Sequence, residues 1–189
     1  MNKFILGVAA AALGLSTQFA NAEETLKLGL SHALSGPAAY FGTNASWVAQ
    51  KAIDRINEDG GVKVGDKVYK LETVGYDNQY TAAGGATAAQ NMILRDNIRI
   101  IANSQSTSAV IATQAITERA GALLFTGVWG RSVKGPEHPM TFTNLNSPPE
   151  ILPPLYKYVH ENHPEAKTVA LLNPNDASGQ EIAKEAVIQ

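Results

Sequence analysis

The sequence predicts an α/β fold in which a parallel sheet carries helices on both faces. Predominantly apolar runs at residues 98–102, 122–126 and 168–172 are typical of strands that are buried on both faces. Segments with apolar residues at helical spacing separate these runs. Strands that alternate with helices favour parallel pairing, because each helix provides the crossover connection that two parallel strands need.

The first half of the chain is expected to hold two strand–helix units. The predicted elements are a strand at 26–30, a helix at 42–58, a small excursion at 62–67, an alternating strand at 68–74 and an alanine-rich helix at 81–96. Asp59-Gly60-Gly61 ends the first helix, because glycine accepts the left-handed conformation found at helix ends. The pair Gly84-Gly85 makes the start of the second helix harder to place, because glycine is a poor helix former.

The second half repeats the same unit. The predicted elements are a strand at 98–102, a helix at 106–120, a strand at 122–126, a short strand at 140–144, a helix at 148–163, a buried strand at 168–172 and a helix from 179 to 189. Pro149 suits the first turn of its helix, where no backbone donor is needed. We therefore expect the second half to extend the same parallel sheet.

Residues 1–22 are predicted to form a cleavable secretory signal peptide. Lys3 provides a positive start, residues 4–15 are apolar, and residues 20–22 (Ala-Asn-Ala) match a small-x-small cleavage site. The apolar stretch is shorter than the roughly 20 residues that a membrane-spanning helix needs. We expect export to the periplasm and a mature chain that starts near Glu23.

The composition argues against several classes of function. The 189 residues include 15 basic and 17 acidic side chains, with a net charge of −2. A nucleic-acid or anionic-membrane partner usually requires a basic patch, so we expect no nucleic-acid partner. The chain contains no cysteine, which excludes thiol chemistry.

The loop at residues 103–108 is the strongest candidate for a ligand site. It follows a predicted buried strand and leads into a predicted helix, where free N–H groups and the positive end of the helix dipole favour an anion. The hydroxyl groups of Ser106, Thr107 and Ser108 add donors without adding charge. The run therefore predicts a carboxylate site, and the alternative is that one of these residues only caps the helix.

Three other loops, at residues 31–41, 77–80 and 127–131, end at the same edge of the expected sheet, where open α/β sheets bind their ligands. In residues 127–131, Trp129 either walls a pocket or packs over the core, and the flanking glycines let the backbone approach a ligand. In residues 35–42, the aromatic pair Tyr40 and Phe41 follows a Ser-Gly-Pro turn. One of these two is expected to line the crevice and the other to enter the core.

Signals for catalysis or a metal site are weak. The sequence has no G-x-S-x-G motif, no Walker A motif, and no G-x-G-x-x-G after the first strand. His160 and His163 have i, i+3 spacing, but they lie beside Pro164 and have no third ligand nearby, which favours surface positions over metal binding. We expect no enzyme activity, no cofactor and no metal.

Several short motifs occur in a fixed order along the chain. They are Leu-Ser-Gly-Pro at 34–37 with an aromatic residue and glycine after it, Ala-Ile-Asp-Arg-Ile-Asn at 52–57 leading into Gly-Gly-Val at 60–62, Tyr-Asp at 76–77, the Ser/Thr run after residue 102, and Gly-Pro at 135–136 before Thr-Phe at 141–142. Together they resemble the type I periplasmic binding proteins of ABC transporters, specifically the leucine/isoleucine/valine-binding branch.

This resemblance implies a two-lobed, hinged protein that closes on an amino acid or a similar small carboxylate and delivers it to an ABC permease in the inner membrane. It places the ligand carboxylate on Ser106, Thr107 and Ser108, backbone contacts on Val128, Trp129 and Gly130, and an aromatic contact on Phe41, with Tyr40 as the alternative. Members of the branch usually have small residues at Val128 and Trp129, and often an aromatic residue at Ser178 before Gly179. These departures leave the ligand class open.

The family is about twice as long as this chain. We therefore expect a signal peptide at 1–22, an N-terminal ligand-binding lobe at 23–145, and an incomplete second lobe that begins at 146–189. The expected function is that of the extracytoplasmic substrate-binding component of an ABC importer. The alternatives are the ligand-binding domain of a sensory receptor and, less favoured, an exported α/β enzyme.

Overall fold

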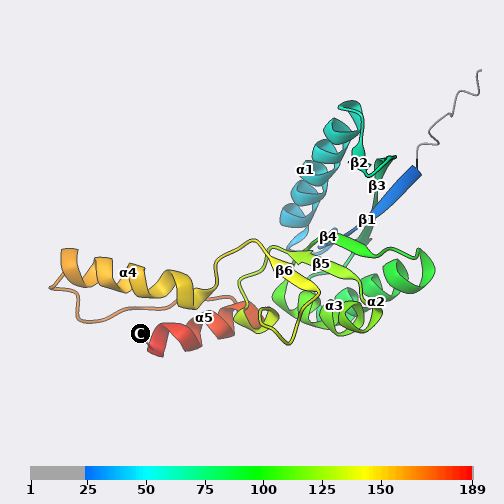
Figure 1. The fold of residues 1–189 in the computed structure, drawn as a ribbon. Coiled ribbons are helices and arrows are strands. Elements are labelled where there is room, and N and C mark those ends of the chain that lie inside the picture. The colour runs from blue at the N-terminus through cyan, green and yellow to red at the C-terminus, as the bar shows by residue number, and fades with distance from the viewer. Residues whose placement is uncertain (1–23, 189) are drawn as a thin grey trace, which may run out of the picture.

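The computed structural model describes residues 24–188, so the predicted signal peptide lies outside the described residues. The strands are β1 (Glu24–His32), β2 (Val62–Val64), β3 (Lys67–Asp77), β4 (Ile100–Ser104), β5 (Leu123–Thr126) and β6 (Thr141–Thr143). They form one sheet in the order β2-β3-β1-β4-β5-β6 (Figure 1). Every neighbouring pair is parallel except β2 and β3, which are antiparallel. The parallel sheet is confirmed, with an antiparallel edge strand where the sequence predicted an excursion.

Helices cover both faces of this sheet, as predicted. They are α1 (Ala39–Glu58), α2 (Ala82–Gln90), the π-helical turn η1 (Asn91–Arg95), α3 (Thr107–Ala120), the 3-10 turn η2 (Arg131–Val133), α4 (Pro148–Asn162) and α5 (Ala177–Ile188). In Figure 1, α1 lies against one face of β1 and β3, while α2 and α3 lie across the opposite face. The layers therefore agree with the α/β fold class that the sequence predicts.

The main core lies between the sheet and the helices α2 and α3. Its fully buried apolar side chains include Met92, Ile98, Ile101, Val110 and Leu124. Helices α2 and α3 approach closely at Gly85, where a Cβ atom would lie 2.4 Å from the Ala109 carbonyl oxygen. The glycine that made α2 hard to place in the sequence is therefore needed for its packing on α3.

Strand β4 begins and ends two residues later than predicted, so Asn103 and Ser104 belong to the strand and not to the loop. Ser104 is fully buried and lies opposite Ser31 of β1 in the sheet. The Thr126 hydroxyl donates to the Ser104 carbonyl oxygen at 2.8 Å. Polar side chains at 103–104 predict a loop, but neighbouring strands extend β4 over both residues and bury Ser104.

The predicted buried strand at residues 168–172 is wrong. The segment is extended but pairs with no strand of the described chain, and Leu172 is 100% and Val169 61% exposed. An apolar run becomes a buried strand only where neighbouring strands satisfy its backbone and other elements cover its side chains. Residues 168–172 have neither a neighbouring strand nor a covering element among the described residues.

Residues 146–188 form an arm that extends from the sheet (Figure 1). The N-terminus of α4 is capped by Ser147, whose N–H and hydroxyl both donate to the Glu150 carboxylate. These two hydrogen bonds, with a further one from Lys134, lower the pKa of Glu150 to about 2. At the other end of the arm, the Tyr156 hydroxyl joins α4 to α5 by donating to the Ala186 carbonyl oxygen at 3.1 Å.

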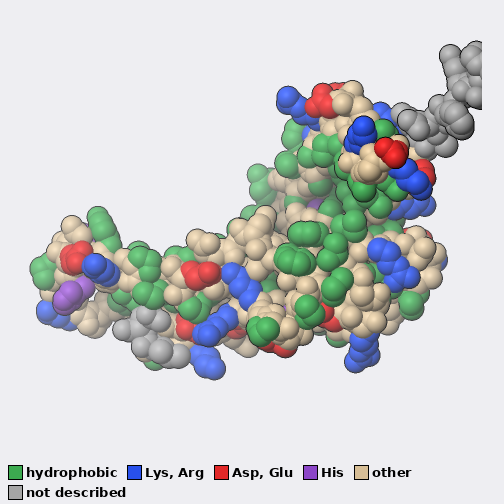
Figure 2. Space-filling view, viewed as in Figure 1, with side chains coloured by type: hydrophobic (Ala, Val, Ile, Leu, Met, Phe, Trp, Pro, Cys, Tyr) green, Lys and Arg blue, Asp and Glu red, His purple; other side chains and the backbone are tan. Residues whose placement is uncertain are grey.

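The face of the sheet opposite α3 is open at β5 and β6. Phe125 and Phe142 stack there with ring centroids 5.4 Å apart and are 41% and 48% exposed. Figure 2 shows charged side chains of both signs scattered over the visible face, without a large patch of one sign. Between residues 24 and 188, no helix combines the length and the apolar character needed to cross a membrane.

Candidate functional site

The carboxyl ends of β1, β3 and β4 are joined by the buried side chain of Asn78. Its amide nitrogen donates to the carbonyl oxygens of Ser31 and Gln105, both at 3.0 Å. Its amide oxygen accepts from the Tyr80 N–H at 2.9 Å. Because Gln105 directly precedes α3, Asn78 fixes the start of that helix relative to the other two strand ends.

The loop after β1 is held by Asp77 at the end of β3. The carboxylate accepts hydrogen bonds from the N–H groups of Leu34 (2.9 Å) and Gln79 (2.8 Å) and from the Ser35 hydroxyl (2.5 Å). Partial burial opposes ionisation, but these hydrogen bonds together hold the pKa of Asp77 below its ordinary value. The Leu-Ser-Gly-Pro motif at 34–37 and the Tyr-Asp motif at 76–77, which are distant in the sequence, therefore meet in the structure. Their contact positions Pro37 at the cleft described below.

The start of α3 assigns different roles to its hydroxyl residues. The Ser106 oxygen accepts from the Ala109 N–H at 3.4 Å and donates to the Tyr80 carbonyl oxygen at 3.3 Å, so Ser106 is the helix cap. Its φ of 73° lies in a region that residues other than glycine rarely adopt. The hydroxyl of Thr107, which is buried, forms no hydrogen bond with the residues that the structure describes, and it remains available to a ligand.

The loop after β5 packs directly against Thr107. A Cβ atom at the buried Gly130 would lie 2.4 Å from the Thr107 Cγ2 atom, so only glycine allows this approach. The close contact brings Val128, which is buried, and Trp129, which is 46% exposed, to the side of the helix start.

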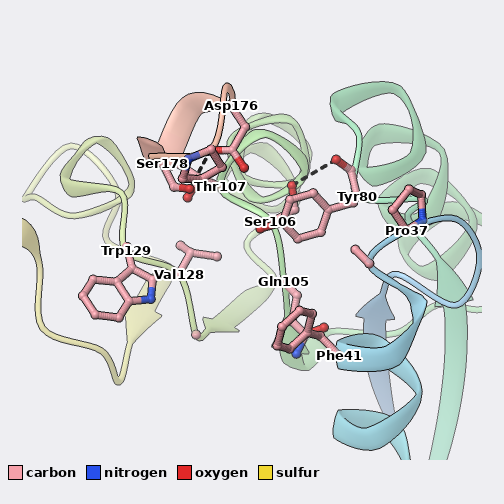
Figure 3. Close-up of a pocket in the computed structure, with 13 residues that line it drawn as sticks. Pro37, Phe41, Tyr80, Gln105, Ser106, Thr107, Val128, Trp129, Asp176 and Ser178 are labelled. Atoms are coloured by element: carbon pink, nitrogen blue, oxygen red, sulfur yellow. Dashed lines mark hydrogen bonds between the residues drawn. The ribbon is translucent and has the colours of Figure 1, made fainter. Parts of the chain in front are cut away.

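These loops surround a cleft of about 500 Å³ (Figure 3). A volume of this size suits a small organic ligand. Of the residues predicted from the sequence, the lining contains Phe41, Ser106, Thr107, Val128 and Trp129. It does not contain Ser108, Gly130 or the alternative aromatic residue Tyr40, which is 74% exposed.

The rest of the lining lies outside the ligand-binding residues predicted from the sequence, although several of its members belong to the candidate loops. It consists of Pro37, Ala38, Tyr80, Gln105, Gly127, Pro174, Asp176 and Ser178. Asp176 and Ser178 come from the arm, and Asp176 Oδ1 accepts from the Ser178 hydroxyl at 2.7 Å and the Gly179 N–H at 2.9 Å. An aspartate three residues before a predicted helical glycine is a helix-cap signal that could have drawn attention to this position. Burial, and to a lesser degree the Asp176 charge, raise the pKa of Tyr80.

A metal centre is not evident in the described part of the chain. Residues 24–188 contain no group of three or more His, Cys, Asp or Glu side chains placed to hold an ion. His32, the buried histidine, forms a hydrogen bond with the Ser46 hydroxyl through Nδ1 at 2.6 Å.

Comparisons with known proteins agree with this architecture. A family model described as "Periplasmic binding protein" matches residues 25–188. The "Leucine-, isoleucine-, valine-, threonine-, and alanine-binding protein" of Pseudomonas aeruginosa is 27% identical over 182 residues, which are 94% of this chain and 46% of that protein. "Leu/Ile/Val-binding protein homolog 4" of Brucella abortus is 38% identical over 112 residues, 59% of this chain and 25% of that protein.

Solved structures show the same fold. The branched-chain amino acid transporter substrate binding protein LivJ of Streptococcus pneumoniae, in complex with isoleucine, superposes with a TM-score of 0.71 at 24% identity, over 86% of this chain and 45% of that one. A solute binding protein of an ABC transporter from R. palustris, in complex with 4-hydroxybenzoate, gives a TM-score of 0.71 at 22% identity, over 87% and 43%.

The chain spans about half the length of these relatives. The family match nevertheless covers almost all of the described residues. The members of this family are solute-binding proteins and not enzymes. The chain belongs to the periplasmic binding protein family, and it is similar to the leucine/isoleucine/valine-binding branch of that family.

Proposed function

We propose that this chain is the extracytoplasmic substrate-binding component of an ABC importer and that it binds an amino acid or a related small carboxylate in the cleft at the start of α3. The observation that carries the proposal is the position of Thr107. Thr107 is buried as a residue, its hydroxyl is unused by the described residues, and it begins the 14-residue helix α3. A carboxylate at this point would accept hydrogen bonds from N–H and O–H donors and interact favourably with the helix dipole.

The relatives support the chemical class of this ligand. The name of the Pseudomonas protein refers to five amino acids, and the R. palustris protein was crystallised with 4-hydroxybenzoate. Each of these compounds carries one carboxylate and differs in the remainder of the molecule. A shared carboxylate site at α3 with variable walls, here Val128 and Trp129, accounts for this range.

The test is to remove the Thr107 hydroxyl while keeping the shape of the side chain. Thr107→Val should raise the Kd for L-leucine at least tenfold, because a hydrogen bond to a charged group contributes about 1.5–3 kcal/mol. Ser108→Ala is the matched control, since Ser108 lies in the same helical turn but outside the cleft lining. Calorimetry should show a Kd within twofold of the unmodified chain for this control. Equal effects of both substitutions, or no effect of either, would contradict the proposed site.

Periplasmic location and an inner-membrane ABC permease partner follow from this proposal. The family match and the signal-like start at residues 1–22 support them. N-terminal sequencing of the protein recovered from the periplasm should read Glu23-Glu24-Thr25. An intact Met1 on that protein would argue against the cleavage site.

A further inference from the structure

The sheet face that α1 partly covers is open over β5 and β6. In Figure 1, α1 lies over β1 and β3, and no described helix lies beside it over β5 and β6. The stacked rings of Phe125 and Phe142 line a hollow of about 350 Å³ there, together with Ala102, Asn103 and Asn144. We call this surface the aromatic floor. All of its lining residues belong to the described chain, and none of them is charged.

The aromatic floor also contains an unused hydrogen-bond acceptor. The side-chain oxygen of Asn103 is buried but accepts no hydrogen bond from any residue that the structure describes. A buried polar atom without a partner costs free energy, which a donor from a covering surface would recover. The aromatic floor therefore suits a surface that is mainly apolar but has an N–H or O–H donor at its border.

Helix α1 carries an apolar stripe that is also uncovered. Ala45, Val48, Ala52 and Ile56 recur at helical spacing and lie on one side of the helix. Val48 is 58% and Ile56 is 38% exposed. A helix of a globular protein normally buries such a stripe against another element. The two alanines leave room for close approach of that element.

The stripe of one chain cannot cover the aromatic floor of the same chain. Helix α1 is fixed over β1 by the hydrogen bond between Ser46 and His32. It is fixed over β3 by Asn57, whose side-chain oxygen accepts from the Leu71 N–H at 2.8 Å. The stripe lies on the other side of α1 from Asn57, so it faces toward the β4 side of the sheet and away from β3. A covering element for the floor has to come from a second molecule.

We propose that two copies of this chain form a twofold-symmetric dimer in which the apolar stripe on α1 of each copy covers the aromatic floor of the other. The inference goes beyond the proposed function, because it concerns a surface outside the ligand cleft and requires no ligand.

A second copy fits this surface for three reasons. Each copy carries both the stripe and the floor, so a twofold axis forms the same contact twice and leaves neither exposed. The floor has no charge, so two identical surfaces meet there without repulsion. Lys51 and Arg55 border the stripe and provide N–H donors that can reach the Asn103 oxygen of the other copy.

The test uses two substitutions that each place a charge in the proposed interface. Sedimentation equilibrium of the unmodified chain should show the mass of two chains at high concentration and of one chain after dilution. Val48→Glu and Phe142→Lys should each raise the dissociation constant of the dimer by roughly 100-fold or more, because each leaves an unpaired charge against an apolar surface. Unfolding midpoints that match that of the dissociated unmodified chain would show that both variants are folded. Val48 lies on the exposed surface of a helix, so Val48→Glu tests the interface even where Phe142→Lys lowers the midpoint.

Mixing the two variants tests the twofold arrangement itself. In a dimer with one copy of each variant, the new glutamate faces the new lysine at one contact, and the other contact keeps Val48 and Phe142. The mixture should therefore dimerise although neither variant does so alone. Two controls place a charge on exposed leucines elsewhere: Leu94→Glu in η1, which continues α2 on the opposite face, and Leu172→Glu in the arm. Both should dimerise as the unmodified chain does.

Several results would overturn the proposal. An unmodified chain that stays a single chain at every concentration has no such interface. Dimerisation that survives Val48→Glu and Phe142→Lys, or that is lost in Leu172→Glu, places the contact on another surface, the arm in the second case. A mixture that remains monomeric shows that the stripe and the floor do not meet each other across a twofold axis.

Discussion

Residues 122–126 and 168–172 have nearly the same apolar character, but only the first segment became a buried strand. In β5, Leu124 is fully buried because β4 and β6 flank the strand and α3 covers it. In the arm, Leu172 is 100% exposed and its segment pairs with no described strand. The difference shows that an apolar run specifies the potential to be a strand, whereas neighbouring elements decide whether its side chains are buried.

The largest expected contrast between the two regions is in core packing. Leu124→Ala should lower the free energy of unfolding by about 4 kcal/mol, because it leaves a cavity in a packed core. Leu172→Ala should lower it by less than about 0.5 kcal/mol, because that side chain is already exposed. Urea unfolding followed by circular dichroism measures both. Similar losses in the two variants would mean that residues 168–172 are packed in solution.

The second contrast is between buried His32 and exposed His160, in how the free energy of unfolding depends on pH. Burial lowers the pKa of His32 from 6.5 to about 4. Between these values the unfolded chain binds a proton that the folded chain does not, so stability is complete above about pH 6.5 and falls as the pH drops toward 4. This difference corresponds to about 3 kcal/mol.

Two histidine variants isolate this effect. His32→Gln should flatten the dependence of the unfolding free energy on pH between 6.5 and 4. His160→Gln, on the exposed surface of α4, should leave the slope as it is in the unmodified chain. Parallel slopes for the unmodified chain and the His32 variant would show that His32 is not responsible.

The smallest of the three contrasts is between the side-chain amides of buried Asn78 and exposed Asn162. Asn78→Ala should lower the free energy of unfolding by about 2 kcal/mol, because buried partners at three strand ends lose their hydrogen bonds. Asn162→Ala, which removes an exposed hydrogen bond to the Tyr158 carbonyl oxygen, should cost less than about 0.5 kcal/mol. Because Asn78 also fixes Gln105, only its variant should weaken ligand binding. Undiminished binding in that variant would show that the start of α3 is held by other contacts.

Much of the fold was predictable because periodicity reflects local burial. Strands β1, β3, β5 and β6 and helices α1, α3, α4 and α5 lie within a few residues of their predicted positions. The errors occurred where tertiary contacts oppose the local signal. Ser104 is polar but buried in a strand, and residues 168–172 are apolar but largely exposed.

The candidate site was predictable only on the side formed by the loops of the sheet. Hydroxyl residues after an apolar run marked Thr107, and the order of strands and helices indicated which loops would meet. The separate roles of Ser106, which caps the helix, and Thr107, which faces the cleft, depend on backbone angles that composition does not encode. Asp176 reaches the cleft from the arm, so its position depends on how a distant segment lies over the sheet.

The stacked pair of Phe125 and Phe142 has a consequence for the behaviour of the chain in solution. Phe125 is 41% and Phe142 is 48% exposed, and the two rings lie on neighbouring strands. An apolar surface of this kind favours contact with other apolar surfaces over contact with water. Such contacts strengthen when salts such as sulfate are added, since these salts are excluded from protein surfaces. These two aromatic rings, which lie outside the cleft, therefore lower the concentration at which ligand binding by this chain can be titrated without self-association.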